Sequence, residues 1–240
     1  MTYDMMILYA VLLLVGGVFS TMSGGGLGIM TIVLGSFFLD IRTNIAFTAV
    51  LMTGIQVAKI SYFHRFIRWD AVKWYVLGGI PMSFVGGLLL FIVSPRIPEL
   101  LLAGSCIVFV ILRFKKSTPK LGTGPGTLFV VGASNGFIGG LTGNASMMRG
   151  SALLSMGLTK EGFIGTSTMI SFLMNLGKLA AYVPNLPWDP PALILLAMSI
   201  PGLMLSVWIG KKLLTYVSVA IFEDMQLVVI LAGAVRLLFS

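Results

Sequence analysis

Four cationic side chains lie inside apolar segments of this sequence without an acidic residue beside them. They are Lys59, Arg149, Lys178 and Arg236. A lysine or arginine at the centre of a membrane helix costs at least about 2.5 kcal/mol, so such residues usually mark a functional path. All eight acids lie in or beside predicted loops. Cations without partners in an apolar environment predict an anionic ligand.

The position of each cation leaves a second interpretation open. Lys59 and Lys178 lie near their predicted helix ends and could snorkel to the membrane interface, as could Arg236 near the C-terminus. Arg149 lies only about 7–8 Å beyond the loop that precedes its segment, at a rise of about 1.5 Å per residue. It reaches water only if that loop is shallow. We therefore expect Arg149 to bind the anion and leave both roles open for the two lysines.

Two short loops, which we name the first tip (residues 23–26) and the second tip (residues 142–145), predict further anion-binding groups. Each tip separates two apolar segments and precedes a short helix, whose free backbone N–H groups and positive dipole end attract anions. Glycine allows close approach to the backbone, and serine is a good N-cap. The same glycines could instead serve helix packing. The candidate ligands are Ser23, Gly24, Gly25, Gly26, Thr142, Gly143, Asn144 and Ser146.

A stripe of polar residues runs along each of two apolar segments, 43–62 and 162–183. At about 100° per residue, each stripe occupies a narrow sector of its helix and should face protein or a water-filled path. We expect the stripes to line a substrate path; the alternative is that they bond neighbouring helices together. The stripes consist of Thr48, Gln56 and Lys59 in the first segment, and of Ser167, Ser171, Asn175 and Lys178 in the second.

The two stripes also indicate an internal repeat. Three pairs are separated by 119 residues: Thr48 with Ser167, Gln56 with Asn175, and Lys59 with Lys178. The two tips align at about the same offset. We therefore divide the single transmembrane domain into a first repeat, residues 1–120, and a second repeat, residues 121–240.

The composition places these elements in a membrane. Of the 240 residues, 57% are hydrophobic and only 10% are charged, whereas soluble proteins carry about 25% charged residues. A spanning helix needs about 20 apolar residues, so segments 27–39 and 146–157 are too short and should be arms of re-entrant or broken hairpins. The predicted fold class is an all-α polytopic membrane protein. Each half contains one hairpin and three spanning helices.

Loop charges predict how the chain is oriented. The loops 63–71 and 113–125 are rich in lysine and arginine and should be cytoplasmic, whereas loop 184–190 carries only one acid and should face outward. These assignments agree only if each hairpin returns to the side it started from. Each half then crosses the membrane three times. Because three is an odd number, the second repeat is inverted relative to the first, which is a common transporter architecture. We expect an inner or plasma membrane location with both termini outside.

Other functional classes lack a signal in the sequence. With one histidine, His64, and one cysteine, Cys106, we expect no metal site, no cofactor and no catalytic set, so the protein should not be an enzyme. The net charge of +8 arises mainly from loop residues rather than a nucleic-acid-binding surface. The expected partners are a small anionic substrate and the lipid bilayer. A homo-oligomer stays open.

Glycine- and proline-containing motifs recur in a fixed order along the chain. They are Gly16-Gly17 before Ser23-Gly24-Gly25-Gly26-Leu27-Gly28, then Gly139-Gly140-Leu141-Thr142-Gly143, Gly165-Thr166-Ser167, and the helices with Pro81/Gly86-Gly87 and Pro201-Gly202. Over nearly the whole length this order resembles the sulfite exporter TauE/SafE family, also called the 4-toluene sulfonate uptake permease family. The resemblance implies a multi-pass permease for small sulfur-containing or carboxylate anions. The sequence departs from the family pattern at Met30-Thr31-Ile32, where a proline is usual, at the second tip, where more glycine is usual, and at Arg149.

Together these features predict a membrane transporter, a permease or exporter, for sulfite, a sulfonate or a related organosulfur or carboxylate anion. It would work by alternating access of two inverted repeats. Export of an anion from a cell that is negative inside is favoured by about 2.3 kcal/mol per charge per 100 mV. Two alternatives stay open: an anion channel, and a non-transporting membrane scaffold or assembly protein.

Overall fold

The computed structural model describes residues 27–37, 39–114, 122–144 and 146–186, with scattered positions before residue 19 and after residue 193. This part of the chain is all-helical, which confirms the predicted all-α class. Its α-helices are α2 (Leu27–Gly35), α3 (Ile41–Phe63), α4 (Trp69–Ile92), α5 (Arg96–Phe114), α6 (Pro125–Thr142), α7 (Ser146–Leu154) and α8 (Lys160–Tyr182). Two short 3-10 helices, His64–Phe66 and Val183–Asn185, follow α3 and α8.

The helices begin and end close to the predicted segment boundaries. α2 and α7 have nine residues each, far below the roughly 20 needed to span a bilayer. Two described helical stretches, Ile41–Phe66 and Trp69–Ile92, are long and apolar enough to cross a membrane. The other expected crossings and the inversion of the second repeat stay predictions. Segments 5–22, 191–210 and 219–239 lie largely outside the described residues.

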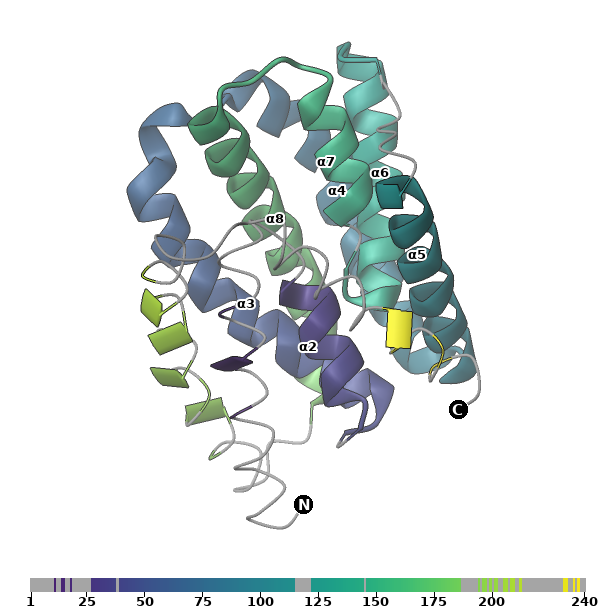
Figure 1. The fold of residues 1–240 in the computed structure, drawn as a ribbon. Coiled ribbons are helices and arrows are strands. Elements are labelled where there is room, and N and C mark those ends of the chain that lie inside the picture. The colour runs from purple at the N-terminus through teal and green to yellow at the C-terminus, as the bar shows by residue number, and fades with distance from the viewer. Residues whose placement is uncertain are drawn as a thin grey trace.

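Close contact between α4 and α6 forms the centre of the described structure (Figure 1). Three glycines, Gly132, Gly136 and Gly140, recur at every fourth position along α6, so they form one face of that helix. A Cβ atom at Gly140 would lie 2.5 Å from the carbonyl oxygen of Ser83 on α4. The two backbones therefore approach closer than any larger side chain allows, which is the usual form of small-residue packing between membrane helices.

Helix α8 packs against both α4 and α3, and so joins the two sides of the molecule. Its side chains belong to an apolar cluster that also contains the buried Tyr75 of α4 and residues of α6 and α7. A second cluster includes residues of α2, α3 and the middle of α5. The polar residues of α3 and α8 lie where these two helices meet.

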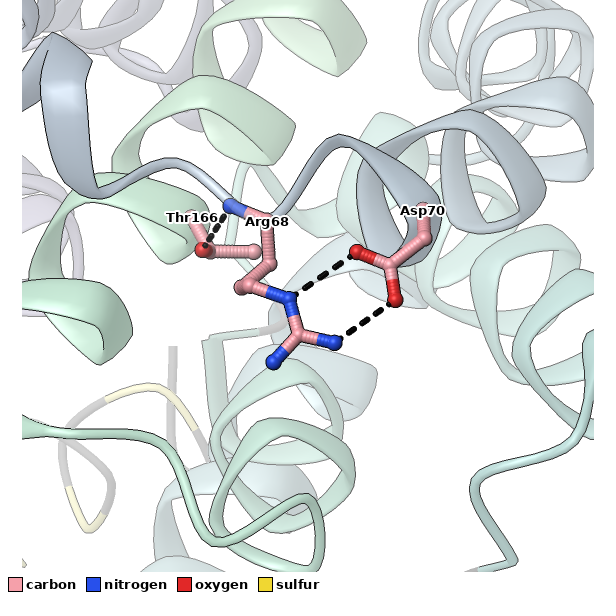
Figure 2. A network of polar contacts seen from close by, with 3 residues as sticks. All are labelled: Arg68, Asp70 and Thr166. Atoms are coloured by element: carbon pink, nitrogen blue, oxygen red, sulfur yellow. Dashed lines mark hydrogen bonds and ion pairs between the residues drawn. The ribbon is translucent and has the colours of Figure 1, made fainter.

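The start of α8 is held to the loop between α3 and α4. The backbone N–H of Arg68 donates a hydrogen bond of 3.0 Å to Oγ1 of Thr166, a fully buried side chain (Figure 2). The guanidinium of Arg68 turns away and pairs with Asp70 at 2.8 Å. A Cβ atom at the adjacent Gly165 would lie 2.8 Å from the carbonyl oxygen of Phe63. Backbone contact therefore sets this junction, and the ion pair lies on its surface.

Replacing Gly136 by alanine tests the contact between α4 and α6. The new Cβ would strike the backbone of Gly79 and Ser83, which cannot rotate away, and overpacking of this kind costs about 1–3 kcal/mol. We expect a lower thermal unfolding midpoint in detergent. Gly104→Ala is the matched control, because a Cβ there meets nothing within 4 Å and alanine favours a helix by about 0.5–1 kcal/mol. Equal midpoints for the two variants would contradict the packing argument.

Arg68 makes two polar contacts, and we expect their removal to lower the unfolding midpoint by unequal amounts. Thr166→Val leaves the Arg68 N–H without its acceptor, at a cost of about 1–3 kcal/mol, and should lower the unfolding midpoint. Asp70→Asn should leave that midpoint almost unchanged, since both side chains of the ion pair are more than half exposed to solvent (54% and 56%).

The same ion pair sets the direction of a small pH dependence. The hydrogen bonds from Arg68 hold the pKa of Asp70 below its ordinary value. The pair therefore contributes its stability above the ordinary carboxyl pKa, and this contribution is lost as the pH falls through the lowered one. Unfolding midpoints measured between pH 3 and 7 should converge for wild type and Asp70→Asn at the acid end. A difference that grows toward acid pH would contradict this assignment.

Candidate anion-binding site

The side chains of Arg149 and Lys178 both form hydrogen bonds with other parts of the protein. Nε of Arg149, on α7, donates a hydrogen bond of 3.0 Å to Oγ of Ser167 on α8. Nζ of Lys178, on α8, donates one of 3.1 Å to the carbonyl oxygen of Gly143 in the second tip. Lys178 therefore contacts the tip rather than extending toward the end of its helix.

Arg149 lies within electrostatic range of both Lys59 and Lys178, and we call these three residues the cation cluster. Each of the three side chains is only partly buried among the described residues. Among the described residues none of the three forms an ion pair. The described acids all lie at helix starts: Asp40, Asp70, Glu99 and Glu161.

The second tip lies against the beginning of α2. Gly143 has φ of +80°, a left-handed conformation that ends α6 and that glycine adopts without strain. A Cβ atom there would lie 2.6 Å from Cδ1 of Ile32 on α2. At Gly28, in the first turn of α2, a Cβ atom would lie 2.9 Å from Nδ2 of Asn144. The α2 and α7 helices, on the same side of the molecule in Figure 1, thus start close to one tip.

The second tip is also stabilised from within. The hydroxyl of Thr142, fully buried, lies 2.8 Å from the carbonyl oxygen of Ile138 and 3.0 Å from that of Asn144. It can donate to either oxygen, one turn before the tip or inside it. Because a carbonyl at a helix end lacks an intrahelical partner, this hydroxyl replaces part of the bonding lost where α6 stops.

Three stripe residues bond α3 to α8. Nε2 of Gln56 donates to Oγ of Ser171 at 3.0 Å, and Nδ2 of Asn175 donates to the carbonyl oxygen of Ala49 and to Oγ1 of Thr53, both at 2.7 Å. Residue numbers rise along one helix as they fall along the other, so the helices are antiparallel. The described contacts of these residues are those of helix–helix bonding, and their contact with substrate stays a prediction.

A known protein family matches the part of the chain that contains these residues. The model of the family described as sulfite exporter TauE/SafE matches residues 8–237. The chain belongs to this family. Neither the curated proteins nor the solved structures gave a significant match. TauE/SafE proteins are transporters of sulfur anions rather than enzymes, which agrees with the membrane and transport features expected from the sequence.

The structure brings part of the predicted TauE/SafE site together. Arg149 of α7 bonds Ser167 of α8, and Lys178 of α8 bonds Gly143 of the second tip. Thr48 is buried with Oγ1 lacking a hydrogen-bond partner in the described part of the chain. Ser146 is the first residue of α7, and its side chain lies outside the described atoms. The whole first tip and Arg236 also lie outside them: Ser23, Gly24, Gly25, Gly26 and Arg236.

One residue of this region was missed by the sequence argument. Tyr75 of α4 is fully buried, its hydroxyl has no hydrogen-bond partner in the described part of the chain, and its ring belongs to one apolar cluster with Ala152 and Leu153 of α7. In the sequence it is one aromatic residue in an apolar segment, and aromatic residues are common near membrane interfaces. Only its position relative to α7 distinguishes it.

Two glycines with left-handed backbones allow a controlled test of the second tip. Gly143→Ala combines a left-handed penalty of about 1–2 kcal/mol with a clash against Ile32 and Ile45. Gly157, with φ of +62°, has open space around it, so Gly157→Ala carries the backbone penalty alone. We expect Gly143→Ala to lower the unfolding midpoint clearly more than Gly157→Ala. Equal losses would mean that the tip is not packed against α2 and α3.

Proposed function

We propose that this TauE/SafE protein transports sulfite, a sulfonate or a related organosulfur or carboxylate anion across the inner or plasma membrane. The cluster of Lys59, Arg149 and Lys178 carries this proposal, because Arg149 repels both lysines and none of the three pairs with a described acid. An anion entering that region relieves the repulsion and gains three attractive interactions. Such attractions are strong where water is excluded.

The environment of Arg149 suits an oxyanion in particular. Ser167 accepts from Nε and so orients the guanidinium plane. The structure gives no hydrogen bond from its two terminal nitrogens to any described residue, and these form the planar fork that binds two oxygens at once. The start of α7 lies three residues earlier on the same helix, and its free N–H groups add favourable potential for an anion.

The bond from Lys178 to Gly143 supports a link between binding and movement. The carbonyl of Gly143 is a weaker partner for an ammonium group than a full negative charge, so an arriving anion competes for Lys178. Transfer of Lys178 to the anion would release the second tip from α8. Movement of the tip would then depend on occupancy of the site, as alternating access requires.

The contacts between α3 and α8 support two inverted repeats, residues 1–120 and 121–240. Gln56 and Asn175, equivalent in the predicted repeat, each bond across to the opposite helix: Gln56 to a residue four before Asn175, and Asn175 to one three before Gln56. A two-fold axis between antiparallel helices produces such reciprocal pairs. In our proposed orientation the loops 63–71 and 113–125 are cytoplasmic and both termini are outside.

The transport proposal needs only a small anion and a lipid bilayer as partners, with no cofactor and no nucleic acid. Export of the anion from a cell that is negative inside gains about 2.3 kcal/mol per charge per 100 mV. This gradient alone can drive net efflux through an alternating site. Oligomer formation is not required by the arrangement of the three cations, since all of them come from one chain.

Replacing Arg149 by alanine tests this proposal in proteoliposomes. Wild type should show saturable flux of sulfite or of a short sulfonate, and Arg149→Ala should reduce it by at least about 100-fold, since a desolvated charge pair is worth several kcal/mol. Arg149→Lys should retain part of the flux with a higher KM, because it keeps the charge but not the planar fork. Arg65→Ala, which removes an exposed loop arginine, is the matched control and should leave flux unchanged.

The same assay separates the alternative functions. Flux that does not saturate, together with a steady anion current, would indicate a channel. Absence of flux for every sulfur oxyanion and short carboxylate would favour a scaffold or assembly protein. Unchanged flux in Arg149→Ala would remove Arg149 from the transport path.

A further inference from the structure

The hydroxyl of Tyr75 is a hydrogen-bonding group for which the fold supplies no partner. Tyr75 has none of its surface exposed, and Oη forms no hydrogen bond within the described part of the chain. A buried polar group without a partner costs about 1–3 kcal/mol, so proteins keep such groups rarely. Tyr182, the other fully buried tyrosine of the described residues, shows the usual arrangement, since its hydroxyl donates to the carbonyl oxygen of Gly140.

The neighbours of Tyr75 place its side chain beside the cation cluster. It packs in one apolar cluster with Ala152 and Leu153 of α7 and with Ile170 and Met174 of α8. Arg149 precedes the two α7 residues by three and four positions, and residues at this spacing share a helix face. Tyr75 therefore approaches from α4 the same side of α7 on which Arg149 lies.

Ser167, which accepts the hydrogen bond from Arg149, shares a face of α8 with neighbours of Tyr75. Ser167 accepts from Nε of Arg149 and precedes Ile170 by three positions and Met174 by seven, so all three lie on one face of α8. Helices α7 and α8 thus present Arg149, Ser167 and the neighbours of Tyr75 toward a common space.

Four other buried polar atoms lack a partner within the described residues: Oγ1 of Thr31, Nε of Arg42, Oγ1 of Thr48 and Oε1 of Gln56. Arg42 and Gln56 each form a hydrogen bond through another side-chain atom. Tyr75 combines an unused hydroxyl donor with packing against the residues of α7 that share a helix face with Arg149.

We propose that Tyr75 binds the transported oxyanion, by donating a hydrogen bond from Oη to an oxygen that Arg149 does not hold. This inference rests on the proposed function and names the substrate class further. A guanidinium fork takes two oxygens, so a third donor selects for anions with a third oxygen on the same atom. The site therefore prefers pyramidal XO₃ groups, as in sulfite and sulfonates, over planar carboxylates with two oxygens.

Tyr75→Phe tests this assignment, because the substitution removes one hydroxyl and leaves the ring in place. In proteoliposomes we expect KM for methanesulfonate to rise about tenfold or more, the usual effect of losing a hydrogen bond to a charged group. KM for acetate should change little, so the preference for sulfonate over acetate falls. The unfolding midpoint without substrate should not fall, since no protein hydrogen bond is lost.

Tyr182→Phe is the matched control. It removes the same atom from the other fully buried tyrosine of the described chain, but here the hydroxyl bonds Gly140. We expect a lower unfolding midpoint and an unchanged ratio of the two KM values. A change in selectivity for Tyr182→Phe equal to that of Tyr75→Phe would overturn the specific role of Tyr75.

Other outcomes also decide against the inference. An unchanged KM for methanesulfonate in Tyr75→Phe, with saturable wild-type flux, would exclude Tyr75 as a ligand while leaving the transport proposal intact. An equal rise for methanesulfonate and acetate would exclude the selectivity. A lowered midpoint without substrate would assign the hydroxyl to a structural, water-bridged bond.

Stabilisation by ligand separates failure of the inference from failure of the proposed function. Methanesulfonate should raise the unfolding midpoint of the wild type in detergent, and Tyr75→Phe should need about tenfold more for the same shift. This result without any flux would support the Tyr75 site and reject transport. No shift in the wild type at any concentration would reject both.

Discussion

Repulsion of Lys59 and Lys178 by Arg149 is the constraint on which the rest of this structure depends. No described acid neutralises these charges, so the protein disperses them with neutral dipoles: the hydroxyl of Ser167 for Arg149 and the carbonyl of Gly143 for Lys178. Dipoles stabilise a cation less than a carboxylate does, and they leave its net charge in place. In the transport that we propose, an anion would bind without displacing an internal counter-ion.

Keeping such charges inside a membrane requires helices that hold their positions firmly. The glycine face of α6 meets the backbone of α4 directly, and the amide groups of Gln56 and Asn175 bond α3 to α8. Within this frame the short helices α2 and α7 meet near the second tip, whose described contacts include the bond from Lys178 and apolar packing against Ile32.

Several elements could be predicted because their signals are local. Helix ends at Phe63, Ile92 and Thr142 follow from glycine, proline or charge in adjacent residues, and the length of α7 follows from the position of the second tip. The expectation that Arg149 turns inward rested on its few residues of distance from that tip, and its bond to Ser167 agrees with it. The paired helix-to-helix bonding of Gln56 and Asn175 was not predictable, since a polar stripe looks the same whether it faces water or another helix.

By itself the sequence determined that the chain is helical, where its helices break, which cations lack acidic partners and, through its motifs, the TauE/SafE family. Composition and spacing suffice for these features because they act over one or two helical turns. Only the tertiary structure decided that Lys178 bonds the second tip, that Arg149 meets Ser167, and that Tyr75 lies beside them. These contacts join α4, α7 and α8 across long stretches of chain, and they depend on how closely glycine faces let the helices pack, which no local pattern encodes.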